Sequence, residues 1–341
     1  MTKNITFLGI ETSCDETAAA VIRENDEGTA DILSNVVSSQ IEEHKKFGGV
    51  VPELAARAHL ENIEYIIDTA LKQSGTAISE IDGVAATAGP GLIVCLTVGL
   101  NIGKSIAAFS NKPLIGVNHL EGHALSPGLN EKIKFPYLLL LISGGHSQFL
   151  VVKDVNEYEQ LGTTIDDALG EAFDKTAKML DLGYPGGPNV EKFSKLGDKN
   201  FFKLPEPIIN KAGCNLSFAG LKTAVLYATK EVGKIDKKTI CDIAASFQSA
   251  ITDVLVHKLI LSAENKKIDC IVLAGGVAAN DELRKKVSEK AKAKNIRTIY
   301  PLLKYCTDNA AMIAYLGSLK AKDRSFALES KVRARWPLQE C

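Results

Sequence analysis

The chain has 341 residues, enough for two domains, and 45% of them are hydrophobic while 24% are charged. The formal net charge of −1 gives no sign of an extended nucleic-acid-binding surface. The seven scattered cysteines contain no C-x-x-C pair, which argues against a disulfide framework and a thiolate zinc site. There is no signal-peptide pattern and no apolar run near the roughly 20 residues that span a bilayer. We therefore expect a cytoplasmic protein without a membrane partner.

Two segments have the pattern of a β-hairpin. Apolar stretches at 5–10 and 18–22 flank a short polar turn, and stretches at 137–142 and 148–152 flank Ser-Gly-Gly-His. These strands are nearly all apolar, which is typical of a sheet covered on both faces. The two glycines of the second turn let the backbone approach a ligand closely and point its N–H groups at an anion.

Helices and strands alternate after each hairpin. We expect a helix from Pro52 to Gly75, a buried helix over 92–109, and a long helix over about 239–264. A further helix follows Asn280, whose side chain is placed to cap it. The stretch TVGLNIGKS resembles a phosphate loop but has only three residues where four are needed, so we interpret it as structural.

Two halves that each open with a hairpin predict a duplicated α/β fold of the actin, sugar-kinase and heat-shock ATPase type. In that fold the two hairpins clamp a nucleotide phosphate, so we expect two lobes with a nucleotide cleft between them. Residues 1–130 would form the N-terminal lobe, and the sequence leaves open whether about 315–341 returns to it. Residues 131–314 would form the C-terminal lobe, with a helical insertion over about 155–235.

A histidine pair is the first candidate site. In NHLEGHALSP, His119 and His123 are four residues apart, so a helix would place both on one face. Glu121 would point away from both, whereas metalloproteases place the general base next to a metal-binding histidine. The pair is therefore a poor match to a protease site. Two interpretations remain open: the two histidines bind one metal ion, or they are ordinary packed or surface residues. Asp308 could add a third ligand suited to iron or zinc, or could simply be an acid at a helix start.

The C-terminal stretch is rich in basic residues. Charge alone favours a solvated terminal segment over a phosphate-binding patch. The residues concerned are Lys320, Lys322, Arg324, Lys331, Arg333 and Arg335.

Nine segments, taken in order, resemble the tRNA adenosine threonylcarbamoyltransferase family, called TsaD in bacteria and formerly labelled a glycoprotease family. They cover nearly the whole chain, which ends near RARWPL. The segments are GIETSCDETAAA, GGVVPELAARAH, AGPGLIVCLTVGL, NHLEGHALSP, LLISGGHSQ, EAFDKTAKMLDLGYPGGP, SFAGLKTA, LAGGVAAN and KYCTDNAAMIA.

The resemblance implies an acyltransferase acting on tRNA. It would move the threonylcarbamoyl group of threonylcarbamoyl-AMP to the exocyclic amine of the adenosine beside the anticodon, in tRNAs that read codons beginning with A, and release AMP. It also implies two partners, a paralogous pseudo-enzyme subunit (TsaB-like) and a small ATPase (TsaE-like). A metal-dependent glycoprotease is the alternative. A sugar kinase or nucleotide-dependent binding module ranks third, because it would not need His119, His123 and Asp308 together.

The resemblance also implies roles for individual residues. His119, His123 and Asp308 would hold one metal ion per subunit, iron in the first place and zinc as the second option. The catalytic residue is left unassigned, with Glu11, Asp15 and Glu16 as candidates that would steer the amine or its proton. If the acceptor is tRNA, the basic character of the tail predicts that Arg333, Arg335 and Trp336 help to dock it. The residues that would contact the adenylate are Leu141, Ile142, Ser143, Gly144, Gly145, Asp174, Gly187, Glu191 and Asn280.

Overall fold

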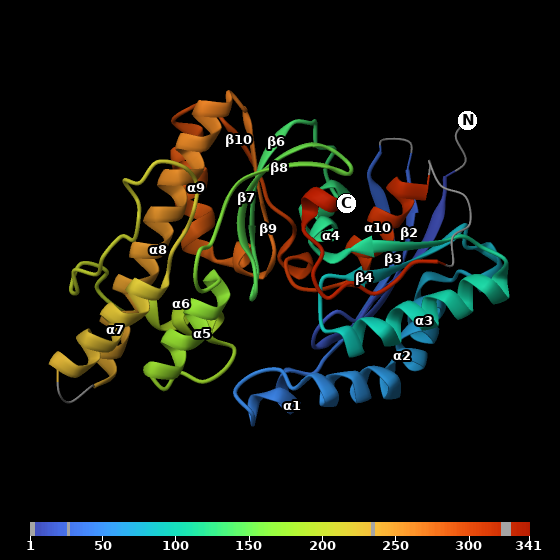
Figure 1. Cartoon of the computed structure of the whole chain (residues 1–341), viewed down its shortest axis with the longest axis horizontal. Helices are drawn as coiled ribbons and strands as arrows, with labels where there is room; N and C mark the ends of the chain where they lie inside the picture. The colour runs from blue at the N-terminus through green and yellow to red at the C-terminus, as the bar shows by residue number, and fades with distance from the viewer. Residues whose placement is uncertain (1–3, 26–27, 233–235, 322–328) are drawn as a thin grey trace. The chain divides into compact units, whose positions relative to one another are not determined.

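A computed structural model describes residues 4–25, 28–232, 236–321 and 329–341 of the chain (Figure 1). It divides into two compact units. Unit 1 comprises Met1–Lys134, Asp154–Glu157 and Pro301–Cys341, and unit 2 comprises Phe135–Lys153 and Tyr158–Tyr300. The last part of the chain therefore belongs to the same unit as the first.

In its described residues, unit 1 holds a five-stranded sheet in the order β3-β2-β1-β4-β5. The predicted hairpin is confirmed, because β1 and β2 pair antiparallel from Thr6 opposite Arg23 to Glu11 opposite Ala18. The outer strand β3 is antiparallel to β2, while β4 and β5 continue the sheet in parallel. The strands are β1 (Thr6–Glu11), β2 (Glu16–Glu24), β3 (Ala30–Ser39), β4 (Gly83–Gly89) and β5 (Leu114–Asn118).

Helices cover both faces of this sheet (Figure 1). Leu8 and Ile10 of β1 pack in one core cluster with residues of α2, while the Cα of Gly9, which faces the other way, lies against α10. The predicted helices over 52–75 and 92–109 are confirmed as α2 and α3, and Gly75 ends α2 at a left-handed φ of 64°. The helices of this unit are α1 (Ile41–Lys45), α2 (Pro52–Ser74), α3 (Ile93–Ser110), α4 (His119–Leu125) and α10 (Ala310–Ala321).

The sequence that resembles a phosphate loop is part of α3, as predicted. Gly99 and Gly103 are buried in this helix. A Cβ added at Gly99 would lie 2.3 Å from the Thr12 hydroxyl oxygen, and one at Gly103 would lie 3.1 Å from the Ala86 Cβ. These glycines therefore allow close packing of α3 on the sheet.

Unit 2 repeats the plan of unit 1, with a sheet in the order β10-β9-β6-β7-β8. Here β6 and β7 form the second predicted hairpin, and β9 and β10 extend the sheet in parallel on the other side of β6. In both units a hairpin carries a third strand, β3 or β8, which the sequence did not predict. The strands are β6 (Tyr137–Ile142), β7 (Ser147–Asp154), β8 (Glu157–Thr163), β9 (Cys270–Ala274) and β10 (Arg297–Ile299).

The long helix α8 forms the centre of the second core. It extends two residues beyond each end of the predicted 239–264, and its Phe247 meets Phe173 of α5 edge to face at 5.3 Å. The helices of this unit are α5 (Leu169–Met179), α6 (Gly186–Ser194), α7 (Ala219–Glu231), α8 (Lys237–Lys266) and α9 (Asp281–Lys292). Short 3-10 helices lie at Ile78–Glu80, Ser126–Leu129, Gly276–Ala279, Leu303–Tyr305 and Leu338–Glu340.

Among the residues that the structure describes, two helices, α3 and α8, are long and apolar enough to cross a membrane by length and composition alone. This is weak evidence, because core helices of globular proteins pass the same test. Most of α8 is buried within unit 2, and α3 packs against β4 and α2.

Candidate metal centre and nucleotide-binding residues

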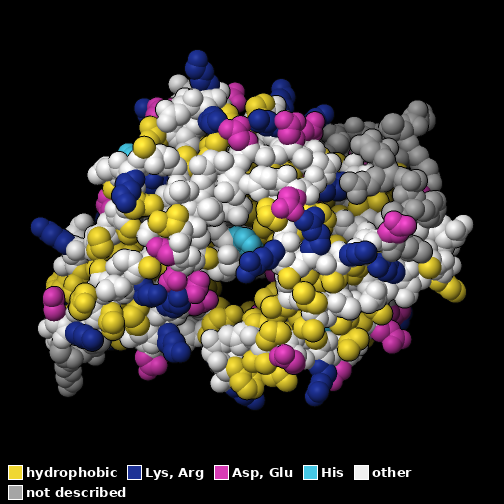
Figure 2. Space-filling view, in the orientation of Figure 1, with side chains coloured by type: hydrophobic (Ala, Val, Ile, Leu, Met, Phe, Trp, Pro, Cys, Tyr) yellow, Lys and Arg dark blue, Asp and Glu magenta, His cyan; other side chains and the backbone are white. Residues whose placement is uncertain are grey.

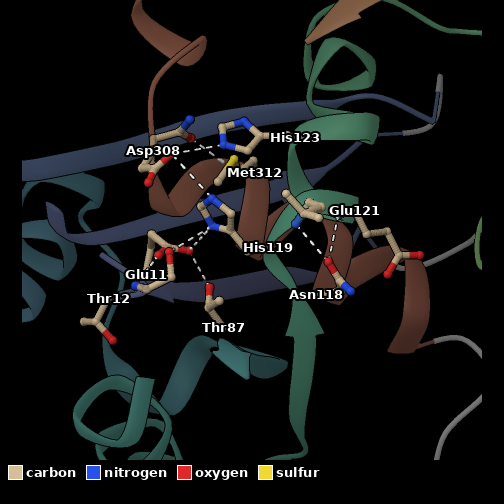
Figure 3. Close-up of polar contacts among 12 residues, drawn as sticks. Glu11, Thr12, Thr87, Asn118, His119, Glu121, His123, Asp308 and Met312 are labelled. Carbon is tan, nitrogen blue, oxygen red and sulfur yellow. Dashed lines mark hydrogen bonds and ion pairs between the residues drawn. The ribbon is translucent and has the colours of Figure 1, made fainter. Parts of the chain in front are cut away.

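The histidine pair lies on α4, which begins directly after β5. The Asn118 side chain caps this helix by accepting hydrogen bonds from the N–H groups of Leu120 at 2.9 Å and Glu121 at 3.3 Å. The cap starts the helix at His119, so His119 and His123 lie one turn apart and point to the same side (Figure 3). Glu121 points away from them, as predicted, toward α10.

Asp308 forms a cluster with the two histidines. The sequence had offered it as a possible third ligand, and the family resemblance implied that role. Its Oδ1 lies 3.0 Å from Nε2 of His123 and 3.5 Å from Nε2 of His119 (Figure 3). The possible ligand atoms of the three residues all lie within 4.8 Å of one another. Asp308 is held in place because the next residue, Asn309, caps α10 by accepting the Met312 N–H at 3.1 Å.

The cluster fits a metal ion by the chemistry of its donors. Nδ1 of His119 lies 3.0 Å from Oε2 of Glu11 at the end of β1, and Glu11 also accepts hydrogen bonds from the Thr87 hydroxyl and the Ser13 N–H. A histidine that donates from Nδ1 to a carboxylate presents the Nε2 lone pair to a metal. Nδ1 of His123 is buried and has no hydrogen-bond partner among the described residues. Two imidazoles and one carboxylate suit iron or zinc with open coordination positions.

Charges in the cluster are strongly coupled. Burial by itself raises the pKa of Asp308, but the neighbouring His119 outweighs it and holds this pKa well below its usual range. Burial lowers the pKa of His119, yet Asp308 and Glu11 raise it well above its ordinary value. The pKa of Glu16 rises to about 10 because of burial, followed by the charges of Asp308 and Asp15. Several carboxylates thus gather here, an environment that favours a cation.

The three candidate catalytic acids occupy different positions. Glu11 is fully buried and bound to the imidazole of His119. Asp15 and Glu16 are partly exposed, at the turn and the start of β2. Glu11 is therefore placed to orient a metal-binding histidine, while Asp15 and Glu16 are more accessible to a substrate.

The turn after β6 offers free backbone donors. Ser143 closes the turn by donating its N–H to the His146 carbonyl oxygen at 2.8 Å, while Gly144 and Gly145 are exposed. Within the described ranges, the N–H groups of these two glycines donate no hydrogen bond. Two other glycines bring neighbouring segments close: a Cβ at Gly275 would lie 2.4 Å from the Ile142 carbonyl oxygen, and one at Gly170 would lie 2.7 Å from the Gly144 Cα.

The remaining predicted nucleotide residues are linked within unit 2. Asp174 of α5 accepts the N–H of Gly186 at 2.7 Å, next to Gly187, where an added Cβ would meet open space. Burial is the main cause that raises the pKa values of Asp174 and of Glu191 on α6.

Asn280 links these residues to α9. The adjacent Asp281 N–H donates to Glu191 at 2.9 Å. Asn280 itself caps α9, as predicted, by accepting from Leu283, and it donates to Gln248 of α8 at 2.9 Å. Much of its side chain therefore already serves the fold.

The basic C-terminal residues do not form one group. Lys320 is buried and paired with Glu121, so including it in a solvated or phosphate-binding tail was wrong. Arg333 pairs with Glu340, and its guanidinium lies 4.7 Å from the centre of the Trp336 ring. Lys331 and Arg335 are exposed. Lys322 and Arg324 lie outside the described residues.

The fold and the cluster define an α/β protein of the duplicated actin-like class with a three-residue candidate metal centre. Two solved HypF structures support the fold alone. One, in a phosphate- and nucleotide-bound form, is 13% identical with a TM-score of 0.64 and is aligned over 96% of this chain and 57% of that chain. The other, from T. kodakarensis, is 15% identical with a TM-score of 0.63 and is aligned over 94% of this chain and 48% of that chain. This chain thus spans about half the length of each.

The family follows from sequence comparison. The model of the TsaD family, described as tRNA N6-adenosine threonylcarbamoyltransferase, matches residues 31–315, and this chain belongs to that family. A relative of that name from Pelagibacter ubique is 54% identical over 99% of this chain and 96% of its own length. A second relative of that name, from Bartonella tribocorum, is 51% identical over 98% of this chain and 95% of its own length. The chain is therefore a transferase of tRNA modification, in agreement with the main prediction and not with the glycoprotease alternative.

Proposed function

We propose that this chain transfers a threonylcarbamoyl group from threonylcarbamoyl-AMP to the exocyclic amine of the adenosine beside the anticodon, in tRNAs that read codons beginning with A. A bond forms between the amine nitrogen and the carbamoyl carbon, and the bond from that carbon to the AMP phosphate oxygen breaks. The amine loses a proton and AMP leaves. The amine is a weak nucleophile because its lone pair is delocalised into the ring, so the carbonyl must be polarised and the leaving group stabilised.

We assign one metal ion per subunit, iron or zinc, to His119, His123 and Asp308. Such a site supplies Lewis-acid polarisation and a fixed template for substrate oxygens. Glu11 orients His119 through the 3.0 Å contact with Nδ1. Asp15 and Glu16 are the proposed groups that steer the amine, because both are partly exposed. Asp15 is the candidate acceptor for the amine proton, since the raised pKa of Glu16 keeps that carboxyl protonated near neutral pH.

The adenylate is assigned to unit 2. The free N–H groups of Gly144 and Gly145, in the run 141–145, are suited to the phosphate oxygens of the leaving AMP. Asp174 and Glu191 offer carboxylates for ribose hydroxyls, and Gly187 leaves room beside Asp174. The remaining amide hydrogen of Asn280 can serve the adenine or the sugar.

One observation carries this proposal: three possible ligand atoms converge within 4.8 Å in a chain that belongs to this family. The test is reconstitution with an adenylate-forming enzyme, the TsaB-like and TsaE-like partners, threonine, bicarbonate, ATP and unmodified tRNA. Threonylcarbamoyladenosine is expected in the tRNA digest. Unmodified tRNA from the complete mixture, together with metal-dependent cleavage of a glycoprotein by this chain alone, would replace the transferase with a protease.

Replacing Asp174 with alanine is expected to weaken AMP binding by about 1.5–3 kcal/mol, because hydrogen bonds to a charged group are lost. Isothermal titration calorimetry measures the change. Asp269→Ala is the matched control, since Asp269 is an exposed aspartate of the same unit and should leave the affinity unchanged. Equal AMP affinity of Asp174→Ala and wild type would place the nucleotide elsewhere.

The tRNA surface is expected to include the exposed end of the C-terminal segment. Basic and acidic side chains are mixed over the face shown in Figure 2. Binding of tRNA phosphates is therefore expected to depend on individual basic side chains and not on a large surface of positive charge. Arg335 is exposed, whereas Arg333 is already paired with Glu340. We place the reaction in the cytoplasm, where the tRNA acceptor is available.

Salt is expected to oppose tRNA binding, because phosphate contacts release counterions when they form. Arg335→Ala should weaken binding at low salt and lower the slope of log affinity against log salt by about 1. Filter binding over a salt series measures both quantities, and Lys72→Ala, which removes an exposed cation of α2 paired with Asp68, is the control. An unchanged slope would remove Arg335 from the tRNA surface.

A further inference from the structure

Glu121 lies between the two histidines in sequence but takes no part in the metal cluster. A helix turns about 100° per residue, so His119 and His123 are about 40° apart while Glu121 is on the opposite side. Glu121 is nevertheless fully buried. Its Oε1 accepts the Asn156 N–H at 3.2 Å, and its Oε2 pairs with the ammonium of Lys320.

Lys320 is equally enclosed. Its side chain is only 4% exposed and that of Glu121 is 0% exposed, so both charges are removed from water. Such a pair is costly to bury, and loss of one partner leaves the other charge uncompensated in the interior. The pair is therefore much more constraining than the exposed ion pairs of this chain, such as Lys72 with Asp68, whose side chains are 75% and 54% exposed.

One continuous segment, Asp308 followed by α10, supplies the partners of both His123 and Glu121. Asp308 lies two residues before the start of α10 and meets His123, whereas Lys320 lies in the last turn of α10 and meets Glu121. Between these points α4 packs closely on α10 at Gly122, where an added Cβ would lie 3.1 Å from Ile313 Cδ1. If the pairing of Glu121 set the position of α4 on α10, a change in that pairing would also change the separation of His123 from Asp308.

We propose that the buried Glu121–Lys320 ion pair is a positioning device that fixes the setting of α4 on α10 and thereby the geometry of the metal centre. This inference rests on the proposed metal site. Neither residue is among the three candidate ligands. The pair acts from the back of α4, and its effect reaches the ligands through the rigid helix.

The test measures Co²⁺ binding to the full-length chain by chelator competition and by the visible absorption of the bound ion, which reports coordination geometry. Lys320→Met is expected to raise the Co²⁺ dissociation constant at least about 10-fold, as loss of a ligand-orienting group commonly does, and to change the spectrum. Lys320→Arg keeps the charge and should stay within about threefold of wild type. Lys72→Met makes the same change at an exposed pair and should have no effect.

The outcomes separate the two proposals. If Lys320→Met binds Co²⁺ with wild-type affinity and spectrum, the positioning role is overturned, even if thermal stability falls. Should Lys320→Met fail to fold, Glu121→Gln serves as the second variant with the same expected loss. His123→Ala tests the metal site itself, and undiminished Co²⁺ binding by that variant would refute the site. If His123→Ala loses Co²⁺ binding while Lys320→Met binds Co²⁺ as wild type does, only the positioning role is refuted.

Discussion

Replacement of His123 with alanine is expected to lower metal affinity more than about 100-fold and to abolish threonylcarbamoyl transfer. Loss of an outer-shell group commonly costs 10- to 100-fold, and loss of a direct ligand costs more. His123 is fully buried, its Nε2 lies 3.0 Å from Asp308 Oδ1, and it supplies one of the three possible ligand atoms of the cluster. Metal content after desalting and nucleoside analysis of the tRNA product measure the two effects.

His257→Ala is the matched control for this variant. His257 is an exposed histidine on α8, outside the metal cluster, and its loss should leave metal content and transfer unchanged. The fold of His123→Ala should survive, because the cavity left by one imidazole lies beside polar groups that water can satisfy. Full metal content in His123→Ala would show that the ion binds elsewhere.

Replacement of Gly9 with alanine is expected to destabilise unit 1 by about 3 kcal/mol, the upper part of the usual range for overpacking. The added Cβ would lie 2.3 Å from the Ala310 carbonyl oxygen and 2.6 Å from the Ala314 nitrogen. These are backbone atoms of α10, so no side-chain rotation relieves the clash and the helix must move. Since Asp308 lies two residues before the start of α10, metal affinity should fall together with stability.

Denaturant unfolding followed by circular dichroism measures the loss of stability, and Co²⁺ titration measures the loss of metal affinity. Gly49→Ala is the control, because a Cβ there meets nothing within 4 Å. If Gly9→Ala matches Gly49→Ala in both measurements, α10 is not held directly on β1 as the structure shows.

Local sequence patterns predicted the elements that are defined by local physics. The apolar strands of both hairpins, the helix from Pro52 to Ser74 and the capping role of Asn280 all follow from periodicity, proline and glycine placement and capping chemistry. The spacing of His119 and His123 likewise determines that they share a helix face. Tertiary partners are harder to predict. The position of Asp308 at a helix start left open whether it is a ligand or an ordinary N-terminal acid, and the family resemblance was needed to assign it to the metal.

Elements at exposed sheet edges were missed because their composition is mixed. Most residues of β3 are partly or fully exposed, and β8 carries two glutamates, so neither has the apolar pattern of the inner strands. Thr87 and Gln248 were missed for a different reason. Each is one polar residue within a buried strand or helix, and its role depends on Glu11 or Asn280, which come from distant parts of the chain.

The positions of the three candidate ligands in the chain determine when the metal centre can assemble during translation. His119 and His123 precede unit 2, whereas Asp308 and the helix that covers one face of the first sheet come after it. The contact between His123 and Asp308 spans 185 positions. On the ribosome, therefore, the first sheet must wait for almost the entire chain before it gains its covering helix. Binding of an ion by all three residues becomes available only once translation has passed residue 308.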